Sequence, residues 1–252
     1  MSGAVYPSLK DRVIVVTGGG TGIGAALTEG FARQGAQVVF LDVAEDASKA
    51  LAAALSDCNP PPLFKPCNLL DLDVLQQTFA DIIADHGPID VLVNNAANDD
   101  RHTLAEVTPA YWDDRIGVNL RHLYFAAQAV APGMRERGAG VILNLGSISW
   151  HLGLPDLSLY ETAKAGIEGM TRALARELGV DGVRVACIVP GNVQTPRQMK
   201  WYTPEGEAEI VNAQCLKGRI QPSDVAALAM FLASDDARFI TGHEYFVDAG
   251  WR

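Results

Sequence analysis

The stretch "TGGGTGIG" at residues 17–24 lies between the apolar run "RVIVVT" (12–17) and a segment with the spacing of an α-helix. A glycine-rich turn that leads from a strand into a helix is typical of phosphate-binding loops. Gly18, Gly22 and Gly24 allow a tight turn, close approach of the backbone to a pyrophosphate, and close packing of the helix. The free N–H groups and the dipole at the helix N-terminus then bind the phosphates. The stretch therefore predicts a dinucleotide-binding α/β fold.

The rest of the chain alternates between apolar strands and helical segments. Six further apolar runs are expected to be strands: "QVVFLD" (37–42), "PLFKPC" (62–67), "IDVLVNN" (89–95), "GVILNLGS" (140–147), "VRVACIVPG" (183–191) and "HEYFVDAG" (243–250). Strands that are apolar throughout and alternate with helices indicate a parallel sheet covered on both faces. We therefore predict a doubly wound α/β Rossmann fold, with a seven-stranded parallel sheet flanked by helices, in a single domain over residues 1–252.

One connection does not fit this regular pattern. Residues 192–215, "NVQTPRQMKWYTPEGEAEIVNAQC", are too many for an ordinary connection in a compact domain. Such a segment is either a lid over a ligand site or an excursion on the surface. We predict a substrate lid at about 192–215, with the surface excursion as the alternative.

Composition and charge exclude several partners and reactions. The formal net charge of −10 over 252 residues disfavours binding to nucleic acid and to anionic membranes. No apolar run reaches the ~20 residues that a membrane helix needs. The four cysteines form no CxxC pair, which indicates reduced thiols in a cytoplasmic protein. The five histidines form no ligand motif such as HExxH, so no metal site is predicted.

Asp42 ends the second expected strand, 18 residues after Gly24. An acidic residue ~20 residues beyond the glycine turn accepts a hydrogen bond from the 2′-hydroxyl of the adenosine ribose. The same carboxylate would repel the 2′-phosphate of NADP, and Thr21 supplies no compensating positive charge. Asp42 therefore favours NAD; the alternative is that it only caps the following helix.

The stretch "YETAK" (160–164) places Tyr160 and Lys164 on one face of a helix, because they are four residues apart. Alone, such a pair could be a lysine that extends beside an interfacial tyrosine. Ser147, at the end of the fifth expected strand, favours catalysis, since ligands of such sheets bind at the carboxyl ends of strands. A phenolate near neutral pH requires a lower pKa than the usual ~10 of tyrosine. A neighbouring ammonium and the positive nicotinamide of NAD⁺ in a dry cleft could lower this pKa.

The order of these motifs carries a family resemblance over nearly the whole chain. With the glycine turn, "NNAA" (94–97), "VNL" (118–120), Ser147 and "YETAK" in sequence, the chain resembles the short-chain dehydrogenase/reductase family. The resemblance implies that Tyr160 is the acid/base and that Lys164 lowers its pKa and binds the nicotinamide ribose. It also implies that Ser147 steadies the substrate oxygen and that Asn119 orders a water in a proton relay.

The resemblance further implies which residues bind the dinucleotide. They are Gly18, Thr21, Gly22, Ile23, Gly24, Asp42, Asn68, Leu69, Asn95, Ala96, Ala97, Tyr160, Lys164, Pro190, Gly191, Val193 and Thr195. Two of these positions depart from the usual pattern. Ala97 stands where the family commonly has glycine, and Asn68 stands where an aspartate often meets the adenine amino group. The Asn68 side-chain oxygen can still accept that hydrogen bond.

Several loops resemble one subgroup of this family, the bacterial NAD-dependent D-xylose 1-dehydrogenases, which oxidise an aldopentose to its lactone. These loops are "NDDRH" (98–102), "GSISWHLGL" (146–154), "KWYTPEGEA" (200–208) and "DAGWR" (248–252). An aldose substrate is therefore expected. The residues expected to contact it are Asn98, Arg101, Ser147, Ser149, His151, Tyr160, Asn192 and Trp201.

Two other functions are compatible with the same fold. One is an NAD(P)-dependent reductase of ketone or 3-oxoacyl substrates, against which Asp42 argues because biosynthetic reduction usually draws on NADP. The other is a non-catalytic dinucleotide-sensing regulator, against which Tyr160 and Lys164 argue. A homotetramer is expected from the family resemblance. The apolar segment 224–234 could supply a subunit face or simply belong to the core.

Overall fold

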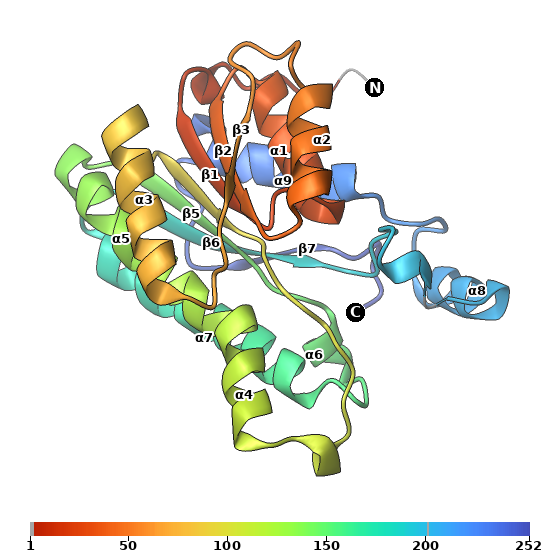
Figure 1. Ribbon diagram of the computed structural model, residues 1–252. Helices are drawn as coiled ribbons and strands as arrows, with labels where there is room; N and C mark the ends of the chain where they lie inside the picture. Colours follow the sequence, from red (N-terminus) through yellow and green to blue (C-terminus); the bar gives the residue numbers. More distant parts are fainter. Residues whose placement is uncertain (1–2, 201) are drawn as a thin grey trace.

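Seven parallel strands form one sheet in the computed structural model, which describes residues 3–200 and 202–252. The strand order is β3-β2-β1-β4-β5-β6-β7 (Figure 1). The strands are β1 (Val13–Thr17), β2 (Gln37–Asp42), β3 (Leu63–Pro66), β4 (Val91–Asn94), β5 (Gly140–Leu145), β6 (Val183–Pro190) and β7 (Glu244–Val247). Each lies within one of the runs expected to be strands, so the predicted doubly wound fold is confirmed.

Helices and short 3₁₀ turns connect the strands. In chain order they are η1 (Pro7–Leu9), α1 (Gly22–Arg33), α2 (Glu45–Ala54), α3 (Leu72–His86), η2 (Leu104–Glu106), α4 (Pro109–Ile116), the π-helix η3 (Gly117–Arg121), α5 (His122–Arg137), α6 (Ser149–Leu152), α7 (Ser158–Gly179), η4 (Gln198–Lys200), α8 (Pro204–Ala213), α9 (Pro222–Ala233) and η5 (Asp235–Ala237). Side-chain caps define several starts: Asp71 accepts from the N–H groups of Asp73 and Val74 in α3, and Thr108 accepts from the N–H of Tyr111 in α4. Within the described ranges, no helix combines the length and apolarity that crossing a membrane requires.

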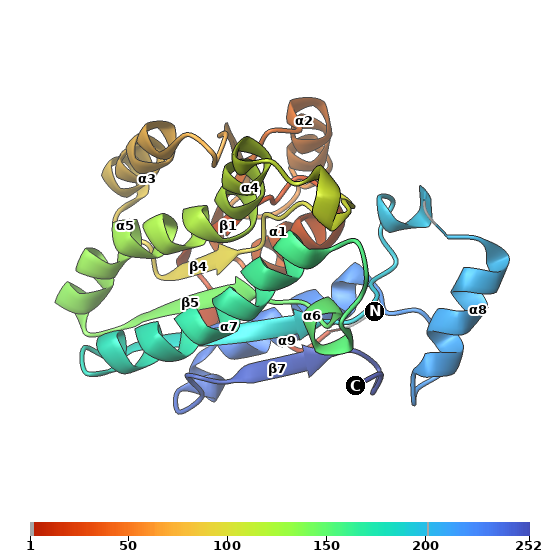
Figure 2. The ribbon, with the colours of Figure 1, turned by 90° about the horizontal axis from the view of Figure 1, so that it is seen from below.

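The strands bury alternate side chains in the two faces of the sheet. In β1, Ile14 and Val16 pack with α1 and α9, whereas Val13 and Val15 pack with α3, α5 and α7. Figures 1 and 2 show α1, α2 and α9 on one face and α3, α5 and α7 on the other. The segment 224–234 falls largely in α9, which packs closely against α1, so its buried side belongs to the core.

The chain order reverses between β1 and β4, and this reversal determines where a ligand can bind. In open α/β sheets a crevice forms at such a point, outside the carboxyl ends of the strands. Segments that follow β1, β4, β5 and β6 contribute lining residues to one cavity at this edge.

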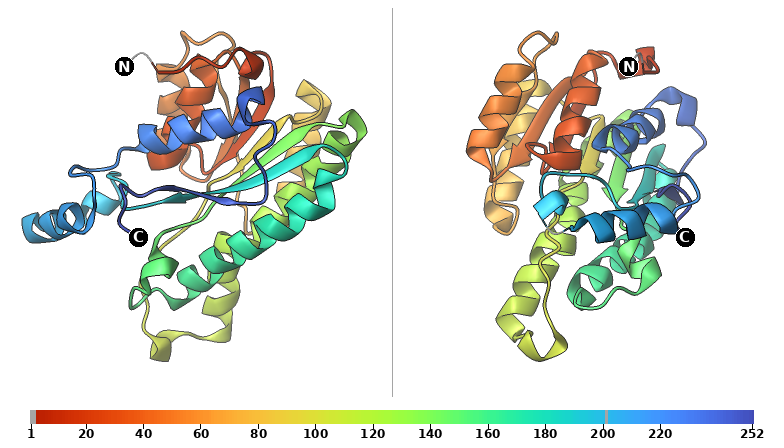
Figure 3. Two further views of the ribbon diagram at one scale, coloured as in Figure 1. Left: turned by 180° about the vertical axis from the view of Figure 1, so that it is seen from behind. Right: turned by 90° about the vertical axis from the view of Figure 1, so that its right-hand side faces the viewer.

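The long connection after β6 contains structure of its own. Residues 192–215 include η4 and α8, and α8 projects away from the sheet and the helices that cover it (Figures 1 and 3). The Thr203 side chain caps α8 by accepting from the N–H of Gly206 at 3.2 Å, and Pro204 occupies the first turn. The segment therefore leaves the sheet edge, turns through a helix and returns to it.

Candidate active site

A cavity of about 840 Å³ lies at the carboxyl ends of the strands, and it extends from Asp42 and Asn68 to Ser147 and Tyr160. Every residue implied to bind the dinucleotide lines this cavity. So do the expected substrate contacts Asn98, Arg101, Ser147, Ser149, Tyr160 and Asn192. Trp201 lies outside the described residues. The predicted cofactor and substrate residues are thus brought to one place, with the exceptions described below.

The glycine turn forms a cradle that only glycine can make. Gly18 has a φ of +62°, and a Cβ at Gly24 would lie 1.8 Å from the Gly18 carbonyl oxygen. The Asn95 side chain donates to the carbonyl oxygens of Thr17 at 3.0 Å and Gly18 at 2.9 Å, which ties the turn to the end of β4. The start of α1 therefore faces the cavity, and this arrangement fits the phosphates of a dinucleotide.

Asp42 has two structural hydrogen bonds. One carboxylate oxygen accepts from the N–H of Gly20 and the other from the N–H of Ala44, both at 2.9 Å. Because Ala44 is the N-cap of α2, Asp42 fixes both the glycine turn and the start of the next helix. Its carboxylate still lines the cavity, and each oxygen has a second lone pair for a hydroxyl donor. Helix fixation and ribose binding are therefore compatible.

Asn68 has a local hydrogen bond of the same kind. Its side-chain oxygen accepts from the N–H of Leu70 at 3.2 Å. A second lone pair on this oxygen is available to an adenine amino group.

Lys164 is buried, with 2% of its surface exposed, and lies beside Tyr160. Its Nζ donates to the carbonyl oxygen of Leu145 at 2.7 Å and lies 5.4 Å from the centre of the Tyr160 ring. Burial lowers the pKa of Lys164 to about 8. The side chain therefore keeps most of its positive charge at pH 7.

Tyr160 is protonated at neutral pH in the protein alone. Burial and then the charge of Asp99 raise its pKa, while a hydrogen bond with the Ser147 side chain and the charge of Arg197 act in the opposite direction. The lowered pKa expected for Tyr160 is thus not present without a cofactor. Burial of the phenol is the largest cause of the raised pKa of Tyr160.

The two serines after β5 form a hydrogen-bonded pair. The Oγ atoms of Ser147 and Ser149 lie 2.9 Å apart, and the N–H of Ser149 donates to Ser147 Oγ at 3.2 Å. Both residues line the cavity. Ser149 therefore fixes the position of the Ser147 hydroxyl.

Asn119 lies in the π-helix η3, but its side chain does not line the cavity. Its oxygen accepts from the N–H of Asn98 at 2.8 Å and its amide group donates to the Asn98 carbonyl oxygen at 2.9 Å. These bonds fix the loop after β4.

His151, which is expected to contact the sugar, is not among the residues that line the cavity. Its Nε2 lies 2.9 Å from a carboxylate oxygen of Glu168, which also accepts from the indole N–H of Trp150 at 2.8 Å. The His151 and Trp150 rings lie 3.9 Å apart. Glu168 is a buried carboxylate that requires hydrogen-bond donors. Its bonds to Trp150 and His151 turn these two side chains of α6 toward α7.

Two other expected sugar contacts already have protein partners. Arg101 donates to the carbonyl oxygen of Pro155 at 3.2 Å. The Asn192 amide group donates to the Tyr202 hydroxyl at 2.5 Å, and its oxygen accepts from Arg219 at 2.8 Å. A substrate that contacts Arg101 or Asn192 would share or replace these bonds.

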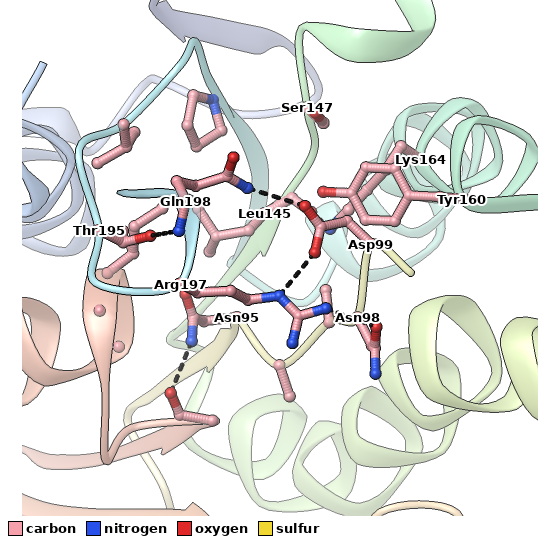
Figure 4. Close-up of a pocket in the computed structure, with 18 of the residues that line it drawn as sticks. Asn95, Asn98, Asp99, Leu145, Ser147, Tyr160, Lys164, Thr195, Arg197 and Gln198 are labelled. Atoms are coloured by element: carbon pink, nitrogen blue, oxygen red, sulfur yellow. Dashed lines mark hydrogen bonds and ion pairs between the residues drawn. The ribbon is translucent and has the colours of Figure 1, made fainter. Parts of the chain in front are cut away.

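A set of contacts across the cavity mouth was not expected from the sequence. Arg197 and Gln198 each donate to one oxygen of the Asp99 carboxylate, both at 2.8 Å (Figure 4). Arg197 also donates to Asp100 at 2.7 Å and to Asn98 at 3.0 Å. From the sequence alone, Asp99 and Asp100 have the character of solvated loop charges. Nothing in the sequence identifies a partner that lies almost 100 residues later.

Within residues 3–200 and 202–252, no group of three or more histidine, cysteine, aspartate or glutamate residues is arranged to hold a metal ion.

Comparisons with known proteins agree with this site. A family described as Enoyl-(acyl carrier protein) reductase matches residues 18–252. A D-xylose 1-dehydrogenase of Caulobacter vibrioides is 68% identical over the whole of both chains. A probable galactose dehydrogenase of Rhizobium meliloti is 44% identical, with 97% of this chain and 96% of the other covered. A solved 7α-hydroxysteroid dehydrogenase in complex with NADH has a TM-score of 0.92 and 28% identity over 97% of this chain and 96% of the other. The chain belongs to the short-chain dehydrogenase/reductase family.

Proposed function

We propose that this protein is an NAD-dependent aldose 1-dehydrogenase, with D-xylose as its preferred substrate and the lactone as its product. The observation that carries the proposal is the placement of Tyr160, Lys164 and Ser147 at one end of a cavity whose other end is the glycine turn and Asp42. The choice of an aldose is supported by the D-xylose 1-dehydrogenase that matches over the full length.

The geometry supports a simple division of chemical roles. The C1 hydroxyl of the sugar would lie between the Ser147 and Tyr160 hydroxyls, where Ser147 holds the oxygen and Tyr160 accepts its proton. Tyr160 must first lose its own proton to solvent, and the positive charge of Lys164 stabilises the phenolate that then accepts the O1 proton. NAD⁺, when bound along the cavity, supplies the acceptor for the hydride that leaves C1. Loss of the O1 proton and the C1 hydride leaves a C1 carbonyl, which is the carbonyl of the lactone.

The preference for NAD over NADP rests on Asp42. Asp42→Ala should lower kcat/KM with NAD⁺ by about 10- to 100-fold, because it removes a charged acceptor for a ribose hydroxyl. The loss with NADP⁺ should be smaller, because repulsion of the 2′-phosphate is removed as well. Steady-state kinetics with both cofactors would measure this ratio. Asp46→Ala, which removes the same charge from an exposed position outside the cavity, is the matched control. An unchanged NAD⁺/NADP⁺ ratio in Asp42→Ala would disprove the ribose assignment.

The reaction itself is tested by mixing the protein with NAD⁺ and a panel of aldoses and recording NADH absorbance. We expect the highest kcat/KM with D-xylose and lower values with other pentoses and with D-galactose. The protein should show little activity with NADPH and a 3-oxoacyl thioester. The reverse pattern would favour the reductase alternative, and cofactor binding without any turnover would favour the dinucleotide-sensing regulator.

Assembly, compartment and the lid are further parts of the proposal. We infer a single-domain, cytoplasmic homotetramer in which residues 192–215 close over the substrate. Trp112 on α4 and Tyr124 on α5 are exposed aromatic side chains, which supports a subunit face on these helices. All four cysteines are free thiols, which supports a reducing compartment. The mass of the native protein in solution would test the tetramer.

A further inference from the structure

Asp99 occupies the position in the cavity mouth where the loop after β4 meets the long connection after β6. Its carboxylate lies near the Tyr160 hydroxyl in Figure 4, and its charge is close enough to raise the pKa of that phenol. One oxygen accepts from Arg197 and the other from Gln198, each at 2.8 Å. The carboxylate is therefore held from the lid side and lines the cavity beside the reacting group.

The backbone beneath Asp99 is fixed as firmly as its side chain. The preceding residue, Asn98, forms two hydrogen bonds with the buried side chain of Asn119, at 2.8 Å and 2.9 Å. The Gln198 side-chain oxygen in turn accepts from the Tyr202 hydroxyl at 2.9 Å, which orients its amide group toward Asp99. Both oxygens of the Asp99 carboxylate are hydrogen-bonded, so the side chain is already fixed. It therefore loses little conformational entropy when a ligand binds.

The charge of Asp99 restricts which substrates the site can accept. A carboxylate is only a hydrogen-bond acceptor, and each oxygen of Asp99 has one lone pair beyond those used by Arg197 and Gln198. A substrate with several hydroxyl groups can donate to these lone pairs. A ketone or an acyl thioester has no donor at this place and would leave these remaining lone pairs desolvated without a partner, at a cost in affinity.

We propose that Asp99 is a specificity-determining residue that accepts a hydrogen bond from an aldose hydroxyl other than the reacting hydroxyl on C1, while Arg197 and Gln198 hold its carboxylate in place. This inference rests on the proposed function as an aldose dehydrogenase. Asp99, and not its neighbours in the loop, then selects substrates that have several hydroxyl groups.

The neighbouring acidic residue provides the contrast. Asp100 bonds to Arg197 at 2.7 Å and to Arg115 at 3.0 Å, but it does not line the cavity. Asp100 therefore stabilises the loop and the lid without facing the substrate. Asp99→Asn and Asp100→Asn remove the same charge from adjacent residues, and only the first change alters the wall of the cavity.

The test compares D-xylose with its 2-deoxy, 3-deoxy and 4-deoxy analogues in wild-type protein and in the two variants. In Asp99→Asn we expect KM for D-xylose to rise about 10- to 100-fold, with a smaller change in kcat and an unchanged KM for NAD⁺. For one deoxy analogue the variant and the wild type should have the same KM, because the hydroxyl that Asp99 binds is already missing. Asp100→Asn should leave the ratio of D-xylose to every analogue unchanged.

The pH dependence of kcat/KM provides a second test, because Asp99 would not change it if its role were only structural. The charged and polar groups that face the Tyr160 hydroxyl are Asp99, Ser147, Lys164 and Arg197. Loss of the Asp99 charge lowers the pKa of Tyr160, so the acid limb of kcat/KM for D-xylose oxidation should move to lower pH in Asp99→Asn. An unmoved limb would contradict the placement of Asp99 beside the phenol.

Failure of the inference is distinguishable from failure of the proposed function. If the wild type oxidises no aldose, the proposed function is wrong. If the wild type oxidises D-xylose but Asp99→Asn changes KM equally for D-xylose and all three analogues, or changes none, Asp99 does not bind a sugar hydroxyl. Asp99→Ala serves as a second variant, and titration of NAD⁺ by fluorescence confirms that each variant is folded.

Discussion

Tyr160→Phe is expected to reduce kcat for aldose oxidation by about 10² to 10⁴-fold, which is the usual contribution of a general acid/base. The change keeps the aromatic ring and removes only the oxygen that accepts the proton of the C1 hydroxyl. Because the ring still fills the same part of the cavity, the dissociation constant for NAD⁺ should change little. Single-turnover and steady-state kinetics would measure the loss, and titration of NAD⁺ would measure the binding.

A second tyrosine provides the control for this substitution. Tyr245 lies in β7 and does not line the cavity, so Tyr245→Phe should retain full activity. If Tyr160→Phe kept kcat within a factor of ten of the wild type, a different residue would have to remove the proton, and the assignment of Tyr160 would be wrong.

Lys164→Met is expected to damage both turnover and cofactor binding, because Lys164 has two proposed roles. We expect kcat to fall by at least about 10²-fold, since the charge that stabilises the phenolate is lost. The KM for NAD⁺ should rise as well, since the ribose loses a donor. Lys49→Met, which removes an exposed lysine from α2 outside the cavity, is the control. Unchanged NAD⁺ affinity in Lys164→Met would remove the ribose-binding role.

The same variant should be more stable than the wild type when no cofactor is bound. The pKa of Lys164 is lowered from about 10.4 in an unfolded chain to about 8 by burial. Below pH 8 the folded protein therefore bears the full cost of a buried ammonium, on the order of 3 kcal/mol, and this cost disappears as the pH rises from 8 toward 10.4. Methionine avoids this cost but leaves the Leu145 carbonyl without its donor.

Thermal unfolding at several pH values would measure the difference. The Tm advantage of Lys164→Met over the wild type should be largest at pH 7 and should shrink as the pH approaches 9. A constant difference across this range would show that the wild-type lysine does not titrate there.

The sheet and the cofactor end of the cavity could be predicted from the sequence because their signals are local. An apolar run of a few residues identifies a strand, and the glycines of residues 17–24 are required by the shape of one turn. The Tyr160–Lys164 pair is likewise set by the period of a single helix. Residues of this kind take their positions largely from their own neighbours in the chain.

The substrate end could be predicted only in part, because side-chain direction there depends on partners that are distant in the sequence. His151 turns away from the cavity because Glu168, on another helix, is a buried carboxylate. Asp99 lines the cavity under the constraint of Arg197, 98 residues later. A single sequence contains no periodic pattern that links such residues.

The bridge between Asp99 and Arg197 also bears on how substrate range can change. The proposed catalytic residues follow β5 or lie on α7, whereas the bridge joins two loops whose lengths and sequences can vary without disturbing the sheet. A graft of residues 97–102 alone from a relative with another substrate would leave Arg197 without its acceptor, and a graft of residues 192–202 alone would leave Asp99 without its donors. The two loops therefore depend on each other, and a change of substrate specificity by loop exchange should replace both of them together.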